Sequence, residues 1–120
     1  MKESANDIEV LTQQLREVAE EQAVNEKERK KLERLEEDVG EFYRKEARLF
    51  DDFLSTWQRD SRMRHFLVEQ QRSCRREQAL TWENIEERRE MLQKERRQLQ
   101  EKETEFFTKR RTLTEAGKPQ

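Results

Sequence analysis

Apolar side chains recur at alternating intervals of three and four residues along most of this chain. In the first half they follow the order Ile8, Leu11, Leu15, Val18, then polar Gln22, Asn25 and Arg29, then Leu32, Val39, Tyr43, Phe50, Phe53 and Trp57. In the second half the repeat is thinner, with Ile85, Leu92, Leu99, Phe106 and Leu113 each seven residues apart. This spacing is typical of a coiled-coil seam, the stripe along which one helix packs against another. The repeat therefore predicts long α-helices.

The composition leaves little room for any other regular structure. Charged residues make up 45% of the 120 residues and hydrophobic residues 31%, with only two glycines and one proline. Such a chain forms either long helices or a disordered polyampholyte. A disordered chain has no reason to keep its leucines in register, so the regular spacing favours helices. At this length the chain is at most one domain with a small core.

Only the segment 55–61, Ser-Thr-Trp-Gln-Arg-Asp-Ser, interrupts the helical pattern. Its short polar side chains compete for backbone hydrogen bonds, and Asp60 or Ser61 can cap a new helix. We therefore predict an all-α fold, an antiparallel two-helix hairpin resembling a coiled coil. The predicted parts are a helix at about 5–54, a turn at about 55–61, a helix at about 62–114 and a tail at 115–120. A single continuous helix is the alternative, because the break contains neither glycine nor proline.

The two halves of the chain carry opposite charge, which favours the hairpin. Residues 1–58 hold 10 basic and 16 acidic side chains, a net charge of −6, whereas residues 59–120 hold 16 basic and 12 acidic ones, a net charge of +4. Two arms of opposite sign attract each other when they lie side by side. If the turn is centred between Gln58 and Arg59, residues whose numbers sum to 117 face each other, so that Leu32 would meet Ile85.

Apolar residues outside the seam predict contacts with further helices. Neighbouring residues on a helix point about 100° apart, so pairs such as Leu49-Phe50 and Phe66-Leu67 cannot both face one partner helix. The apolar surface is thus wider than a two-helix seam needs, and we expect the hairpin to assemble into a larger helical bundle. A broad seam filled within the hairpin itself is the simpler alternative. The predicted partner-binding residues are Leu35, Phe42, Leu49, Leu54, Trp57, Phe66, Trp82, Met91 and Phe107.

Catalytic, metal-binding and nucleic-acid-binding functions find little support in the residues. His65 is the single histidine, and Cys74 has no histidine at a helical neighbour position. Glutamates recur without the Glu-x-x-His pairs of a di-metal bundle, so we expect no enzyme activity, no cofactor and no metal. Arginine pairs such as Arg88-Arg89 invite a nucleic-acid hypothesis. Because glutamates are interleaved with them, we interpret them as a solvated or internally paired face and expect no nucleic-acid partner.

The sequence also bears on localisation. Apolar runs do not exceed three or four residues, which excludes a membrane-spanning helix and membrane insertion. The start of the sequence, Met1-Lys2-Glu3-Ser4, leads into a polar segment without the apolar core of a secretory signal peptide. A single cysteine suits a reducing compartment. We expect a cytoplasmic protein, with co-export by another route left open.

The chain resembles the small α-helical partner proteins encoded beside LXG-type toxins of Gram-positive type VII secretion. The resemblance covers roughly residues 10–113, and more distantly the chain is similar to the WXG-type secreted helical hairpins of the same pathway. It rests on the runs Lys30–Asp38 and Leu92–Leu99, on Arg48-Leu49-Phe50, and on Trp57 with Asp60. The resemblance implies an adaptor or targeting chaperone that binds the helical N-terminal LXG region of a toxin, with a second small helical protein, and promotes its export.

Two departures from the WXG pattern refine this expectation. Arg59 stands where a Trp-x-Gly turn would place glycine, and the Tyr-x-x-x-Asp/Glu export signal after the second helix is absent, because Arg111 follows Phe107 at that spacing. Such a chain would accompany another protein and would not present the export signal itself. The alternative function is a structural coiled-coil homo-oligomer that acts as a scaffold or spacer.

Overall fold

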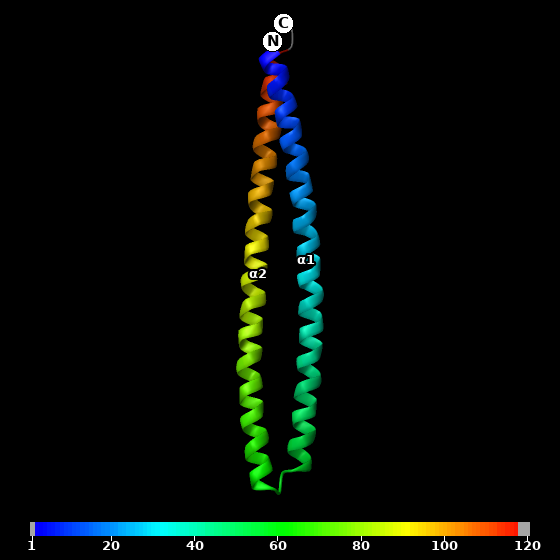
Figure 1. Cartoon of the computed structure of the whole chain (residues 1–120), viewed down its shortest axis with the longest axis vertical. Helices are drawn as coiled ribbons and strands as arrows, with labels where there is room; N and C mark the ends of the chain where they lie inside the picture. The colour runs from blue at the N-terminus through cyan, green and yellow to red at the C-terminus, as the bar shows by residue number, and fades with distance from the viewer. Residues whose placement is uncertain (1, 118–120) are drawn as a thin grey trace. The chain divides into compact units, whose positions relative to one another are not determined.

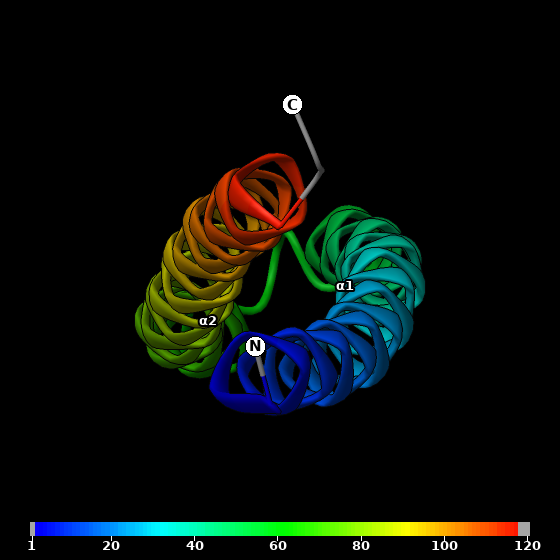
Figure 2. The ribbon, with the colours of Figure 1, turned by 90° about the horizontal axis from the view of Figure 1, so that it is seen from above.

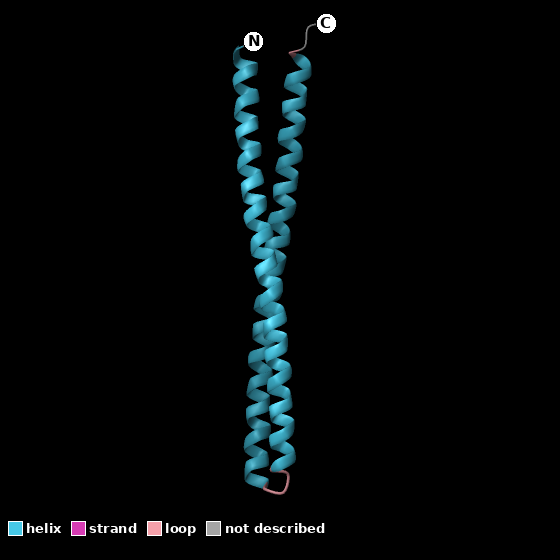
Figure 3. Ribbon diagram, turned by 90° about the vertical axis from the view of Figure 1, so that its right-hand side faces the viewer, coloured by secondary structure: helices cyan, strands magenta, loops and turns pink. Residues whose placement is uncertain are grey.

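A computed structural model describes residues 2–117 of the chain, with side chains described from Ser4 onward. It consists of two helices, α1 at Lys2–Thr56 and α2 at Ser61–Ala116, which pack against each other as a helical hairpin (Figure 1). One short loop joins them, and the described residues form no strand (Figure 3). The structure thus confirms the all-α hairpin and excludes the continuous helix. α1 begins earlier than expected, and α2 continues two residues past position 114. The last three residues of the expected tail lie outside the described chain.

The turn is a compact β-turn over Trp57–Asp60. The Asp60 amide donates to the Trp57 carbonyl at 3.1 Å, and the Trp57 amide donates to the Phe53 carbonyl at 2.9 Å. Asp60 then caps α2, because its Oδ1 accepts a hydrogen bond from the Met63 amide at 3.0 Å. No described residue has a positive φ, so this turn does not require glycine at position 59. Arg59 therefore fits without backbone strain.

The chain divides into two compact units. The terminal unit contains residues 2–29 and 90–117, and the turn unit contains residues 30–89. In the terminal unit the two helical segments lie side by side (Figures 1 and 2). Its core consists of apolar side chains at the predicted seam positions, which are Leu11, Leu15, Val18, Leu92 and Leu99. Ile8, Phe106 and Leu113, also predicted, are half-buried at the same stripe.

Asn25 is the one buried polar residue among the described side chains, with 2% of its surface exposed. Its Nδ2 donates to the Leu92 carbonyl oxygen on the opposite helix at 2.9 Å, and its Oδ1 accepts from Arg29 Nε at 3.0 Å. The side chain of Asn25, in the polar stretch of the seam, therefore forms its hydrogen bonds within the pair of helices. Residues 25 and 92 also sum to 117, which confirms the predicted register in this unit.

In the turn unit the seam shifts by one residue near the end of α1. Leu32, Leu67 and Ile85 are buried, and the covered positions of α1 continue as 36, 39, 43, 46, 50 and 54. The last two steps are both four residues, because a 3.6-residue helix drifts away from a 3.5-residue repeat. The prediction that Phe53 and Trp57 belong to the seam is wrong, since they are 47% and 42% exposed.

Candidate partner-binding surface

The structure exposes eight of the nine predicted partner-binding residues. Phe42 and Met91 are each 62% exposed, the largest fractions among them. The remaining exposed members are Leu35, Leu49, Trp57, Phe66, Trp82 and Phe107. Leu54 is the exception, because the shifted seam leaves it half-buried while Phe53 is exposed.

In the turn unit one side of the helix pair carries most of the exposed apolar surface. On α1, Leu35, Phe42 and Leu49 are seven residues apart, so they return to within about 20° of the same direction, and Phe53 follows four residues later. On α2, Leu80 and Phe66 are fourteen residues apart on one stripe. All six are exposed. We call this set, Leu35, Phe42, Leu49, Phe53, Phe66 and Leu80, the open flank.

A groove connects the two helices on the open flank. It has a volume of about 300 Å³ and is lined by Leu32, Leu35 and Val39 of α1 and by Thr81, Asn84, Ile85 and Arg88 of α2. Leu35 therefore lies on the same side of the pair as Asn84, and Leu80 lies one helical turn before Asn84. The groove floor is apolar, because Leu32 and Ile85 are core residues.

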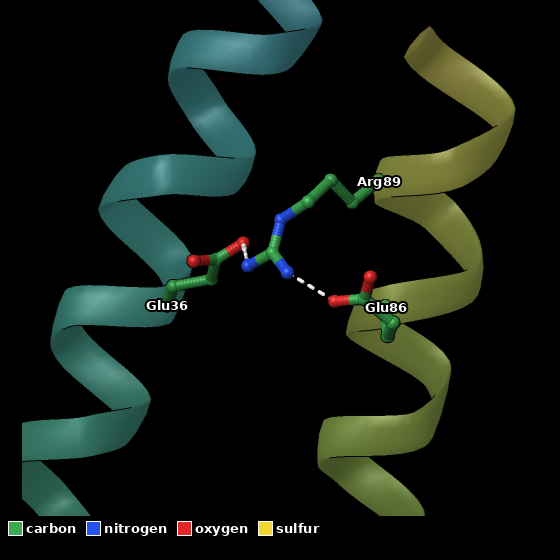
Figure 4. Close-up of polar contacts among 3 residues, drawn as sticks. All are labelled: Glu36, Glu86 and Arg89. Atoms are coloured by element: carbon green, nitrogen blue, oxygen red, sulfur yellow. Dashed lines mark hydrogen bonds and ion pairs between the residues drawn. The ribbon is translucent and has the colours of Figure 1, made fainter. Parts of the chain in front are cut away.

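The opposite side of the turn unit is closed by a charged cluster. The Arg89 guanidinium lies between Glu36 on α1 and Glu86 on α2 and bonds both carboxylates (Figure 4). The hydrogen bond that Arg89 donates to the Glu36 carboxylate raises the pKa of Arg89 above its ordinary value. Side-chain exposure of 38% for Arg89 and 25% for Glu36 makes this pair partly shielded from water. The cluster joins the two helices across this side.

An aromatic contact continues the closed side toward the turn. The Tyr43 and Trp82 rings meet edge to face, with centroids 6.1 Å apart. Gly40 lies beside them: a Cβ there would be 3.8 Å from Trp82 Cη2, an ordinary contact. Leu80 and Trp82 are two residues apart and point about 160° away from each other. We call this set, Glu36, Tyr43, Trp82, Glu86 and Arg89, the closed flank.

The terminal unit has a separate apolar groove of about 460 Å³. Its lining comes from Asp7, Val10, Leu11 and Gln14 of α1 and from Thr108, Lys109, Thr112 and Leu113 of α2. Val10 is 55% exposed and forms an apolar edge of this groove. Phe107 is exposed elsewhere on α2, where the Arg110 guanidinium lies 5.0 Å from its ring centroid. This cation–π contact covers part of Phe107 from within its own helix.

Comparison with known proteins identifies a family for the chain. Residues 6–113 match the family described as protein of unknown function (DUF3958). The chain belongs to the DUF3958 family. No curated protein and no solved structure matches it.

Four exposed apolar residues of this DUF3958 chain were not among the predicted partner-binding residues. They are Val10, Val24, Phe53 and Leu80. Leu80 carried a usable signal, since it is fourteen residues from Phe66 and therefore on the same stripe. Phe53 carried no such signal. It lies three residues after Phe50 and Leu54 lies four residues after Phe50, and both spacings fit the seam.

The chemically reactive side chains of the DUF3958 chain are dispersed. His65 is exposed near the start of α2, and Cys74 is half-buried. Burial raises the pKa of the Cys74 thiol, and the adjacent Glu46 carboxylate raises it further. Among residues 2–117, no three His, Cys, Asp or Glu side chains are grouped so that they could hold a metal ion. Neither helix, over the same residues, is apolar enough over a sufficient length to cross a membrane.

Proposed function

We propose that this chain is a non-enzymatic adaptor that binds the helical N-terminal LXG region of a type VII secretion toxin. It acts in the cytoplasm, together with a second small α-helical protein, and promotes export of the toxin. The sequence resemblance and the exposed apolar surface of the turn unit together support this role. The observation that carries it is the open flank, six large apolar side chains on one side of the turn unit without a covering element in the chain.

The open flank has the form that a helical partner needs. An amphipathic helix binds through anchors spaced at i, i+4 and i+7 that enter an apolar groove. The flank offers Leu35, Phe42 and Leu49 at intervals of seven residues, beside a groove with an apolar floor. Six exposed apolar side chains on one face are costly in water, so a partner that covers them gains hydrophobic free energy.

The closed flank supports a directional role for the hairpin. On that side the two helices are joined to each other by Arg89 and by the Tyr43–Trp82 contact. On the closed flank the side chains of the two helices thus bond to each other. The open flank remains exposed and can bind a helix of another protein. An adaptor that lies along another protein needs such an asymmetric surface.

Copurification tests the proposal. The tagged N-terminal region of the LXG toxin proposed as the partner is coexpressed with the chain and the second small helical protein. The double variant Phe42→Glu/Leu49→Glu should lose copurification at unchanged helix content by circular dichroism. Ala47→Glu is the matched control, because Ala47 is exposed on α1 but lies away from the open flank, and it should copurify normally. Unchanged recovery of the double variant would refute the role of this surface.

A further inference from the structure

The charges beside the open flank form an alternating series along α1. Lys31, Asp38, Lys45 and Asp52 are exposed and follow one another at intervals of seven residues. Each lies three or four residues from a member of the Leu35, Phe42 and Leu49 row, so the two rows run side by side on the helix. The apolar row thus has one charged edge whose sign changes at every step.

This pattern is complementary to itself when the helix is reversed. If Phe42 faces Phe42 of a second copy in antiparallel orientation, Leu35 faces Leu49 of that copy. The charged edge then places Asp38 beside Lys45 of the second copy. It also places Lys31 beside Asp52, so every facing pair has opposite sign. In a parallel two-fold arrangement the charged edges of the two copies would lie on opposite sides of the interface, so these charges would not pair with one another.

We propose that, in the absence of another protein, two copies of this chain pair through the open flank, with their α1 helices antiparallel about Phe42. A two-fold axis generates this isologous interface, in which the same surface patch serves both copies. The axis places both Lys31–Asp52 edges on one side and brings the two α2 helices together on the other. Leu80 and Phe66 then face the second copy, and the product is a four-helix bundle. The inference goes beyond the proposed function, because it concerns the chain alone.

The expected dimer is reversible. The paired stretch of α1 spans about 23 residues, roughly 35 Å of helix, and exposed ion pairs contribute little to affinity but disfavour wrong orientations. The interface is therefore of the small, transient class. The charged row sets the orientation, and the apolar row supplies most of the affinity.

Cysteine cross-linking of the full chain tests the orientation. In a Cys74→Ser background, Phe42→Cys should form a disulfide-linked dimer on oxidation, because residue 42 faces its own copy. Leu35→Cys alone should not, whereas Leu35→Cys mixed with Leu49→Cys should give the mixed dimer. Links between two copies of Leu35→Cys would show a parallel pairing and overturn the proposal, as would the absence of any link. Circular dichroism checks that each variant remains helical.

Charge exchange tests the role of the edge. By sedimentation equilibrium over micromolar to millimolar concentrations, Lys45→Asp should weaken the dimer by about tenfold, because each Asp38 then meets a carboxylate. The double variant Asp38→Lys/Lys45→Asp should restore wild-type affinity within about twofold. Lys109→Asp is the matched control, since Lys45 and Lys109 both pair with a glutamate four residues earlier. A monomeric wild-type chain, or a double variant that dimerises more weakly than Lys45→Asp, would refute the interface and leave the toxin-binding proposal untouched.

Discussion

Asn25 Nδ2 donates a hydrogen bond of 2.9 Å to the carbonyl oxygen of Leu92 within the buried seam of the terminal unit. A buried asparagine in a coiled-coil seam lowers stability but favours the one register in which its polar atoms are satisfied. Here the second polar atom, Oδ1, accepts a hydrogen bond from Arg29 at 3.0 Å. Any shift of α2 along α1 would leave Asn25 buried without its acceptor, so this residue fixes the alignment of the unit.

Replacing Asn25 with leucine should therefore raise stability and loosen the register. We expect the free energy of unfolding of Asn25→Leu to increase by about 1 kcal/mol in urea titrations. The amide NMR signals around Leu92 should double or broaden, because shifted alignments become populated. Gln22→Leu is the control, since it adds leucine to the same seam without removing the Asn25 bond, and its spectrum should stay single. A single sharp spectrum for Asn25→Leu would contradict the role in register.

Gly40 should be replaceable by alanine with a gain in stability. Its φ is negative, and an added Cβ would lie 3.6 Å from Arg44 Nη1 and 3.8 Å from Trp82 Cη2, both ordinary contacts. Alanine is favoured over glycine inside a helix by about 1 kcal/mol, so the free energy of unfolding should rise by about that amount in urea. A loss of stability would mean that the methyl group displaces Trp82, which a change in tryptophan fluorescence would reveal.

The Glu36–Arg89 pair should contribute a small, salt-sensitive coupling energy. Both side chains are partly exposed, and such pairs are worth about 0.2–1 kcal/mol. A double-mutant cycle with Glu36→Gln and Arg89→Met, measured by urea unfolding, should give a coupling within that range that falls when the salt concentration is raised. A coupling that is large and independent of salt would show that the cluster is far better shielded than its exposure indicates.

The Cys74 thiol should react slowly with alkylating reagents. Partial burial and the Glu46 carboxylate raise its pKa, so less thiolate is present at a given pH than in an unfolded chain. A raised native pKa stabilises the fold below the unfolded pKa of the thiol, and this contribution is lost as the pH rises through the native value. Glu46→Gln should lower the pKa and accelerate alkylation by iodoacetamide near pH 8 several-fold. Glu83→Gln, which alters no charge acting on Cys74, should leave the rate unchanged.

Much of the fold was predictable because it depends on local signals. The seven-residue repeat located Leu11, Leu92 and Leu99, and the cap at Asp60 follows from a short acidic side chain just before a new helical stretch. The register could be inferred because the turn is short, so residues equally far from it face each other. These features need only the helix geometry and the position of the break.

The arrangement of the binding surface was less predictable. The positions of Phe42, Leu49 and Met91 outside the seam predicted that these residues are exposed. They did not predict which side of the helix pair would form the open flank. That depends on Arg89, which reaches Glu36 across 53 positions of sequence and joins the helices on one side only. Long charged side chains can bond to several neighbours at similar cost, so the sequence alone leaves the choice of flank undecided.

The seam shift near the turn gives the sharpest test of the boundary between core and surface. Leu54 is half-buried, whereas Phe53 is 47% exposed. Leu54→Ala removes a half-buried side chain and its contacts, so we expect it to lower the free energy of unfolding by about 1–2 kcal/mol. Phe53→Ala should cost less than about 0.5 kcal/mol despite the larger side chain, because surface substitutions have small effects. Urea unfolding of both variants at low protein concentration, where the chain is monomeric, measures the difference. The reverse order, with Phe53→Ala the more destabilising, would return Phe53 to the seam and remove it from the open flank.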